Sequence, residues 1–236
     1  MASFFTALIF IALLESSLTA SAVGFWLPSS LAMVLVGAHF WRRFKSTSLA
    51  LLALSLSLLA VSFLYFSNSA FFSHSVIAAS GIALWALAVA CGRRSFSFAV
   101  AVSFLLFLGS LFALSRFHLF FNASLPAIVL AIFFVTGFFF FLSGRIALPS
   151  LGSALKIRLF VFSLLAGFLI GESYVIFSKL PFTIVTIDFM LFIMYYTMWS
   201  MAFRYFSGTF TKRSLVSGLV LCAFSFAVLL VSALWV

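Results

Sequence analysis

The chain has 236 residues, of which 66% are hydrophobic and 7% are charged. A soluble domain carries about 25% charged residues, so this composition excludes a soluble globular protein, a disordered chain and a coiled coil. The mean hydropathy of +1.37 and apolar runs of roughly 20 residues, the length of a membrane-spanning helix, predict a polytopic integral membrane protein.

The apolar runs are hydrophobic on all sides and lack the alternation of a β-barrel strand, which predicts helices. Residues 3–41 are too long for one straight helix, and Gly24 and Pro28 interrupt them. They predict a first helix at 3–23 and a short second one near 28–41. Seven further runs lie at 46–66, 70–91, 95–115, 123–143, 157–178, 181–203 and 214–236. With the two helices before them, the predicted total is nine, with eight as the alternative.

The loops between these runs are too short to form a soluble domain of their own. We therefore expect residues 1–236 to form a single membrane domain, an all-α polytopic bundle of about nine, alternatively eight, transmembrane helices. Whatever chemistry the protein performs is expected to take place within the bilayer.

The basic residues support this topology. All but two of the 13 Lys and Arg residues fall on one side of the predicted bundle, and the exceptions are Arg116 and Lys179. Loops rich in Lys and Arg face the cytoplasm, or the matrix for a chain encoded in an organelle. The net charge of +10 is thus a topological signal, and no nucleic acid partner is expected. The basic residues on the shared side are Arg42, Arg43, Lys45, Arg93, Arg94, Arg145, Lys156, Arg158, Arg204, Lys212 and Arg213.

The three acidic residues, Glu15, Glu172 and Asp188, all lie within predicted spans. A charged group at the centre of a membrane helix costs at least ~2.5 kcal/mol, so an acid there marks function by default. Glu172 and Asp188 flank the turn at Lys179 and lie at similar depth on adjacent antiparallel helices, where they could share a proton. The alternative is a structural role, with each acid bonded to a neighbouring Ser or Tyr or paired with another subunit.

The run at 157–178 carries two kinds of stripe. Ser163, Gly167 and Gly171 form a ridge of small residues that allows another helix to approach closely. Arg158 and Glu172 are 14 residues apart in sequence, close to four helical turns, so they share nearly the same face at opposite depths.

On the following helix, Asp188, Phe192, Tyr195 and Trp199 recur at helical spacing and form one polar and aromatic face. This pattern makes Tyr195 a further candidate for a proton path, together with Glu172, Asp188, Arg158 and Glu15. The simpler interpretation is a packing face that contains one buried acid.

No cofactor or metal site is expected. Cys91 and Cys222 lie in apolar stretches without a CxxC spacing, which indicates neither a disulfide framework nor zinc. His74 and His118 lie toward the sparsely charged side, and lone histidines near a membrane edge are more often hydrogen-bonding residues than ligands.

Residues 153–160, Ser-Ala-Leu-Lys-Ile-Arg-Leu-Phe, are followed by Ala166 and Gly167. This stretch resembles the arginine-bearing helix of the ATP synthase a subunit, whose pattern is an Arg-Leu-Phe run followed by Ala-Gly. In that family the arginine faces the carboxylates of the rotor and separates two proton half-channels. The resemblance implies that role for Arg158.

Phe occurs 36 times and Gln is absent, a bias that fits strand skew in a small organellar genome. The sequence thus favours a membrane subunit of a proton-translocating complex of the mitochondrial inner membrane, either like the ATP synthase a subunit or from the membrane arm of the respiratory chain. Its expected partners are other membrane subunits and lipid. The alternatives are a small secondary transporter or channel, and a scaffolding subunit with structural acids.

Overall fold

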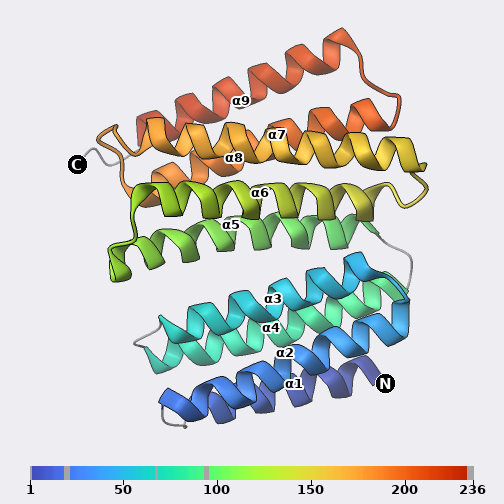
Figure 1. Ribbon diagram of the computed structural model, residues 1–236, viewed down its shortest axis with the longest axis vertical. Coiled ribbons are helices and arrows are strands. Elements are labelled where there is room, and N and C mark those ends of the chain that lie inside the picture. The colour runs from blue at the N-terminus through green and yellow to red at the C-terminus, as the bar shows by residue number, and fades with distance from the viewer. Residues whose placement is uncertain (1, 19–21, 67–68, 93–95, 233–236) are drawn as a thin grey trace. The chain divides into compact units, whose positions relative to one another are not determined.

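The computed structural model describes residues 2–18, 22–66, 69–92 and 96–232, and these residues form nine helices joined by short connections (Figure 1). The predicted all-α membrane bundle is confirmed. The helices are α1 (Ala2–Leu18), α2 (Ala22–Phe44), α3 (Thr47–Tyr65), α4 (Ala70–Gly92), α5 (Phe96–Phe121), α6 (Leu125–Ala147), α7 (Ser153–Phe177), α8 (Ile184–Phe206) and α9 (Lys212–Ser232).

Both helix counts from the sequence have a counterpart in the described residues. Eight helices, α2 to α9, are long and apolar enough to cross a membrane, whereas α1 is a shorter apolar helix of 17 residues. The apolar runs therefore predict the helices well, and α1 falls a few ångströms short of a ~30 Å hydrocarbon core at ~1.5 Å per residue.

The predicted boundary within residues 3–41 is wrong. The first helix ends at Leu18 and α2 begins at Ala22, so Gly24 and Pro28 lie inside α2 rather than between two helices. Proline has no N–H and leaves the carbonyl of the residue four positions earlier without its helical donor. Membrane helices tolerate this because Ser and Thr side chains and neighbouring helices supply alternative hydrogen bonds.

Some helices extend further than predicted, which moves several charges out of the loops. Arg116 lies inside α5, Arg145 lies inside α6, and Lys156 lies in the first turn of α7. Lys and Arg have long flexible side chains whose charged ends can reach the membrane surface from within a helix, so these positions remain compatible with the predicted sidedness.

The helices group into two compact units, and the boundary between them falls inside α5. We call Met1–Leu106 the N-terminal unit and Phe107–Val236 the C-terminal unit. In the N-terminal unit, α1 packs against α2 and α4, and α3 packs against α2 and α4. In the C-terminal unit, α7 packs against α6 and α8, and α8 also contacts α6 and α9.

Successive helices of the C-terminal unit run in opposite directions, so the α6–α7 and α8–α9 connections lie at one end and the α7–α8 connection at the other (Figure 1). Arg145, Arg204 and Lys212 lie at the first end, and Lys179 lies at the second. The arrangement agrees with the charge pattern within this unit. Arg93 and Arg94 lie outside the described residues.

Candidate functional site

Asp188 is the buried acid of the C-terminal unit. It lies four residues after the start of α8, and only 1% of its surface is exposed. The hydroxyl of Ser115 on α5 donates a hydrogen bond of 2.8 Å to its Oδ1. The two residues are 73 positions apart, so the fold alone brings them together.

The second carboxyl oxygen of Asp188 has no protein partner. Its Oδ2 is buried and accepts no hydrogen bond among the residues described. Most buried polar atoms in proteins are hydrogen-bonded, so such an exception calls for a physical explanation. An ionised carboxylate in a medium of low dielectric constant pays a large desolvation penalty, and binding a proton at Oδ2 would remove it.

Tyr195 lies two turns further along α8 and is fully buried. Its ring stacks on Phe107, with 3.9 Å between ring centroids, and meets the ring of Phe140 edge to face at 5.9 Å. Ser143 on α6 is also fully buried, and its hydroxyl donates to the carbonyl oxygen of Phe140. Tyr195 therefore presents a polar group in the middle of an aromatic core.

Buried polar groups occur at several depths across the C-terminal unit. Asp188 lies roughly 6 Å along α8, and Tyr195 and Thr136 lie about 17 Å along α8 and α6, which start on the same side. Ser143 lies four residues before the end of α6. Thr136 and Ser143 are fully buried, so these four side chains form a discontinuous polar series across the unit.

Glu172 and Asp188 lie in different environments. Glu172 is exposed on α7, and no hydrogen bond between the two carboxyl groups is found in the described part of the chain. Tyr174, two residues further along α7, is buried instead. Arg158 is also exposed, so the charged stripe of α7 lies on its outer face.

The small-residue ridge of α7 faces α6 of the same chain. A Cβ atom added to Gly167 would lie 2.5 Å from the carbonyl oxygen of Phe133, and one added to Gly171 would lie 3.5 Å from that of Val129. Ser163 is buried on the same face, opposite Gly137. The helix that packs against this ridge is therefore α6.

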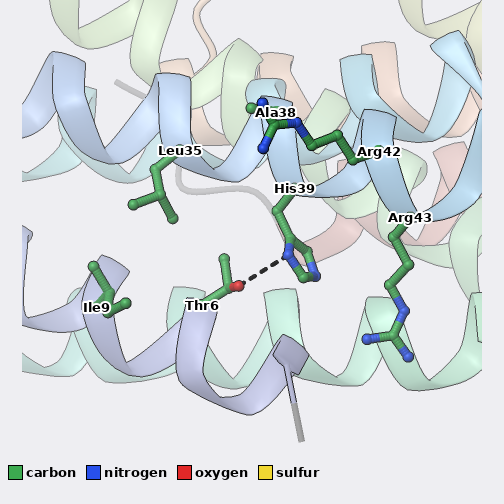
Figure 2. A pocket seen from close by; sticks show the side chains of 7 residues that line it. All are labelled: Thr6, Ile9, Leu35, Ala38, His39, Arg42 and Arg43. Atoms are coloured by element: carbon green, nitrogen blue, oxygen red, sulfur yellow. Dashed lines mark hydrogen bonds between the residues drawn. The ribbon is translucent and has the colours of Figure 1, made fainter.

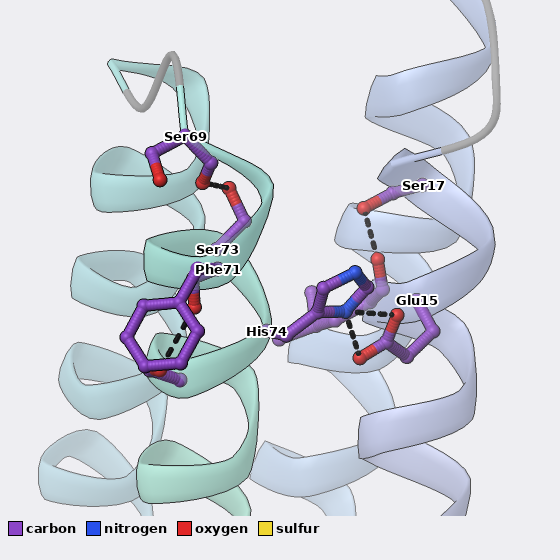
Figure 3. A network of polar contacts seen from close by, with 8 residues as sticks. Glu15, Ser17, Ser69, Phe71, Ser73 and His74 are labelled. Atoms are coloured by element: carbon purple, nitrogen blue, oxygen red, sulfur yellow. Dashed lines mark hydrogen bonds and ion pairs between the residues drawn. The ribbon is translucent and has the colours of Figure 1, made fainter.

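Glu15 is partnered in the N-terminal unit. Its carboxylate oxygens lie 2.9 and 3.0 Å from Nδ1 of His74, which joins α1 to α4 (Figure 3). Both side chains are partly exposed, at 39% for Glu15 and 58% for His74. Glu15 therefore has an imidazole partner, which neither acid of the C-terminal unit has among the residues described.

The remaining candidate ligands are dispersed. Nδ1 of His118 lies 2.8 Å from the carbonyl oxygen of Ala123, and Cys91 and Cys222 are free thiols. Within the described ranges, no three His, Cys, Asp or Glu side chains gather into a group that could hold a metal ion.

The chain matches no known family model, no curated protein sequence and no solved structure. Its function is therefore inferred from the geometry of these residues.

Proposed function

We propose that this chain is a membrane subunit of a proton-translocating, energy-coupling complex, in which Asp188 takes up and releases the proton. The main support for the proposal is that Oδ2 of Asp188 has no described hydrogen-bond partner. Asp188 is 1% exposed and its Oδ1 is bonded to Ser115, while Oδ2 has no partner in the part of the chain that the structure describes.

In this proposal the proton forms an O–H bond with Oδ2 and leaves the same oxygen on release. The hydrogen bond from Ser115 to Oδ1 keeps the carboxyl group in one orientation during both steps. Asp188 lies close to the start of α8, so water on the side of Lys179 is its nearest source of protons. Tyr195 and Ser143 supply hydroxyl groups deeper in the unit, and a transmembrane proton gradient drives the transfer.

The outer face of α7 supports the presence of a neighbouring subunit. Arg158 and Glu172 are exposed at its two ends, and the apolar side chains between them include Leu165 and Phe168, which are 53% and 55% exposed. An exposed arginine on this face is available to a carboxylate of another chain, the role that resemblance to the ATP synthase a subunit assigns to Arg158.

The last helix supports the same interpretation. Ser214 is the one buried residue among those described in α9, and Val220, Phe224 and Val231 are 62%, 66% and 89% exposed. The composition, rich in Phe and without Gln, is the basis for proposing the mitochondrial inner membrane. A membrane-arm subunit of the respiratory chain is the other form of this proposal.

A secondary transporter or channel is the second candidate. The polar series of Asp188, Thr136, Tyr195 and Ser143 is the feature that favours it, because buried hydroxyl groups can also coordinate an ion or substrate. A transporter would work as an isolated chain, whereas a subunit of a complex requires its neighbours. A scaffolding role would leave Asp188 as a structural acid.

Proton flux into vesicles tests the proposal. The purified assembly is reconstituted with a pH-sensitive dye inside, and flux is driven by a potassium diffusion potential. Asp188→Asn preserves size and hydrogen bonding but binds no proton, so flux should fall to the rate of protein-free vesicles. The control is Ser173→Ala, because Ser173 is only partly buried on α7 and bonds the carbonyl of Leu169 in its own helix.

The outcomes separate a proton-carrying Asp188 from a structural one. Unchanged flux in an intact Asp188→Asn assembly would contradict the proposal. Loss of the assembly itself would indicate a structural acid, because removing one partner of a buried polar pair strongly destabilises a protein.

A further inference from the structure

An open groove of about 640 Å³ lies in the N-terminal unit, between the start of α1 and the last turns of α2 (Figure 2). It is separate from Asp188, which lies in the other unit. Its rim carries the two guanidinium groups of Arg42 and Arg43 and the imidazole of His39, which faces Thr6 across the groove.

Two of these side chains are held in place. Nδ1 of His39 lies 3.1 Å from Oγ1 of Thr6. Arg43 donates a hydrogen bond to the hydroxyl of Ser3, and its guanidinium group lies 5.4 Å from the ring centroid of Phe44. The groove therefore has a preformed polar rim that connects α1 to α2.

Arg42 has a different environment. It is exposed, and no hydrogen bond or ion pair to it is found in the described residues. The sequence of the N-terminal unit contains one acidic residue, Glu15, which lies near the far end of α1 and is paired with His74. The cations of the rim thus have no carboxylate of this unit beside them.

The lining changes from polar to apolar with depth. Arg42 and His39 lie in the last two turns of α2, and Thr6 lies near the start of α1, whereas Leu35 and Ile9 lie about one turn deeper on the same two helices. A membrane phospholipid has the same order, with a charged headgroup at the surface and acyl chains below it.

We propose that this groove binds one anionic phospholipid, with its phosphate at Arg42 and an acyl chain along Ile9 and Leu35. Guanidinium groups form short charge-assisted hydrogen bonds with phosphate oxygens. Basic pockets between membrane helices on the positively charged side bind anionic headgroups. The lipid supplies the negative charge that the rim lacks and fills the apolar part of the groove.

Native mass spectrometry of the purified protein with added lipid tests this proposal. The protein should retain phosphatidylglycerol in preference to phosphatidylcholine. Arg42→Gln should lower the affinity for phosphatidylglycerol about fivefold, the effect expected of one basic residue near an anionic lipid. Arg42 has no described partner, so this change leaves the helix contacts intact. Lys212→Gln is the matched control, because Lys212 is an exposed basic residue of the C-terminal unit.

A second variant removes the space without changing the charge. Leu35→Trp should fill the apolar part of the groove and abolish retention of phosphatidylglycerol. Inorganic phosphate and glycerol phosphate should not displace the lipid, since neither carries an acyl chain. Displacement by either compound would identify a site for a soluble anion and overturn the proposal. An equal affinity for the two lipids, or an unchanged affinity in Arg42→Gln, would overturn it as well.

Discussion

A Cβ atom on Gly167 of α7 would lie 2.5 Å from the carbonyl oxygen of Phe133 on α6, so the two helix backbones touch at this point. Gly137 of α6 meets α7 in the same way, since its Cβ would lie 3.3 Å from the carbonyl oxygen of Ser163. Close backbone approach at small residues is a major source of helix association in membranes. The α6–α7 pair therefore depends on the absence of side chains at Gly137 and Gly167.

Gly167→Ala should destabilise the protein by about 1–3 kcal/mol, the usual cost of overpacking, because backbone atoms at Phe133 cannot move aside as a side chain can. The free energy of unfolding from titration with a denaturing detergent measures this effect. Gly152→Ala is the control, since nothing lies within 4 Å of the Cβ position at Gly152. Equal stability of the two variants would contradict the close contact.

Ser115 and Asp188 should be energetically coupled. Ser115→Ala leaves both oxygens of a buried carboxyl group without a described partner, and Asp188→Ala removes the acceptor of the same hydrogen bond. We expect the double variant to differ from the sum of the single variants by about 0.5–3 kcal/mol, as for other pairs in direct contact. Unfolding titrations of the four proteins give this value, and additivity would mean that the hydrogen bond contributes nothing.

The sidedness of the connections can be tested by cysteine labelling. In a variant without Cys91 and Cys222, single cysteines at Ser150 and Ser207 should react with a membrane-impermeant reagent from the positively charged side. A cysteine at Ser178 should react from the opposite side. All three serines are exposed in the connections or at helix ends. Reaction of Ser150→Cys and Ser178→Cys from the same side would show that α7 does not cross the membrane.

We expect purification in a mild detergent to yield a large assembly rather than a single chain. The reason is the exposed surface of α7 and α9, where Leu165, Phe168 and Phe224 have no cover within the described chain. Size-exclusion chromatography with light scattering measures the protein mass without the detergent. A monomer that remains active in proton flux would instead support the transporter.

The long apolar runs predict the helices because membrane length and hydropathy are local properties of the sequence. The prediction is wrong near Pro28, since a proline that would end a helix in water is tolerated in lipid. The ridge at Ser163, Gly167 and Gly171 was predictable as a packing surface, but its spacing does not encode which helix fills it. The sequence also contains no signal for the division of the bundle inside α5.

The candidate site was only partly predictable. Asp188 and Tyr195 stand out because an acid and a tyrosine share one face of an apolar helix. Ser115, Thr136 and Ser143 do not stand out, because serine and threonine are frequent in this chain and commonly bond to their own helix backbone. The partnership of Ser115 with Asp188 depends on tertiary packing over 73 residues, and the difference between Asp188 and Glu172 depends on the face that each helix turns inward.

The length of α1 has a consequence for the surrounding bilayer. Its 17 described residues span about 26 Å at 1.5 Å per residue, whereas the neighbouring α2 has 23 residues. We expect lipid chains beside this described stretch to compress locally, at a fraction of a kcal/mol per ångström of mismatch. Bilayer thickness therefore sets the elastic force that lipid exerts on the N-terminal unit. Membranes of short-chain lipids should hold α1 in place more firmly than membranes of long-chain lipids.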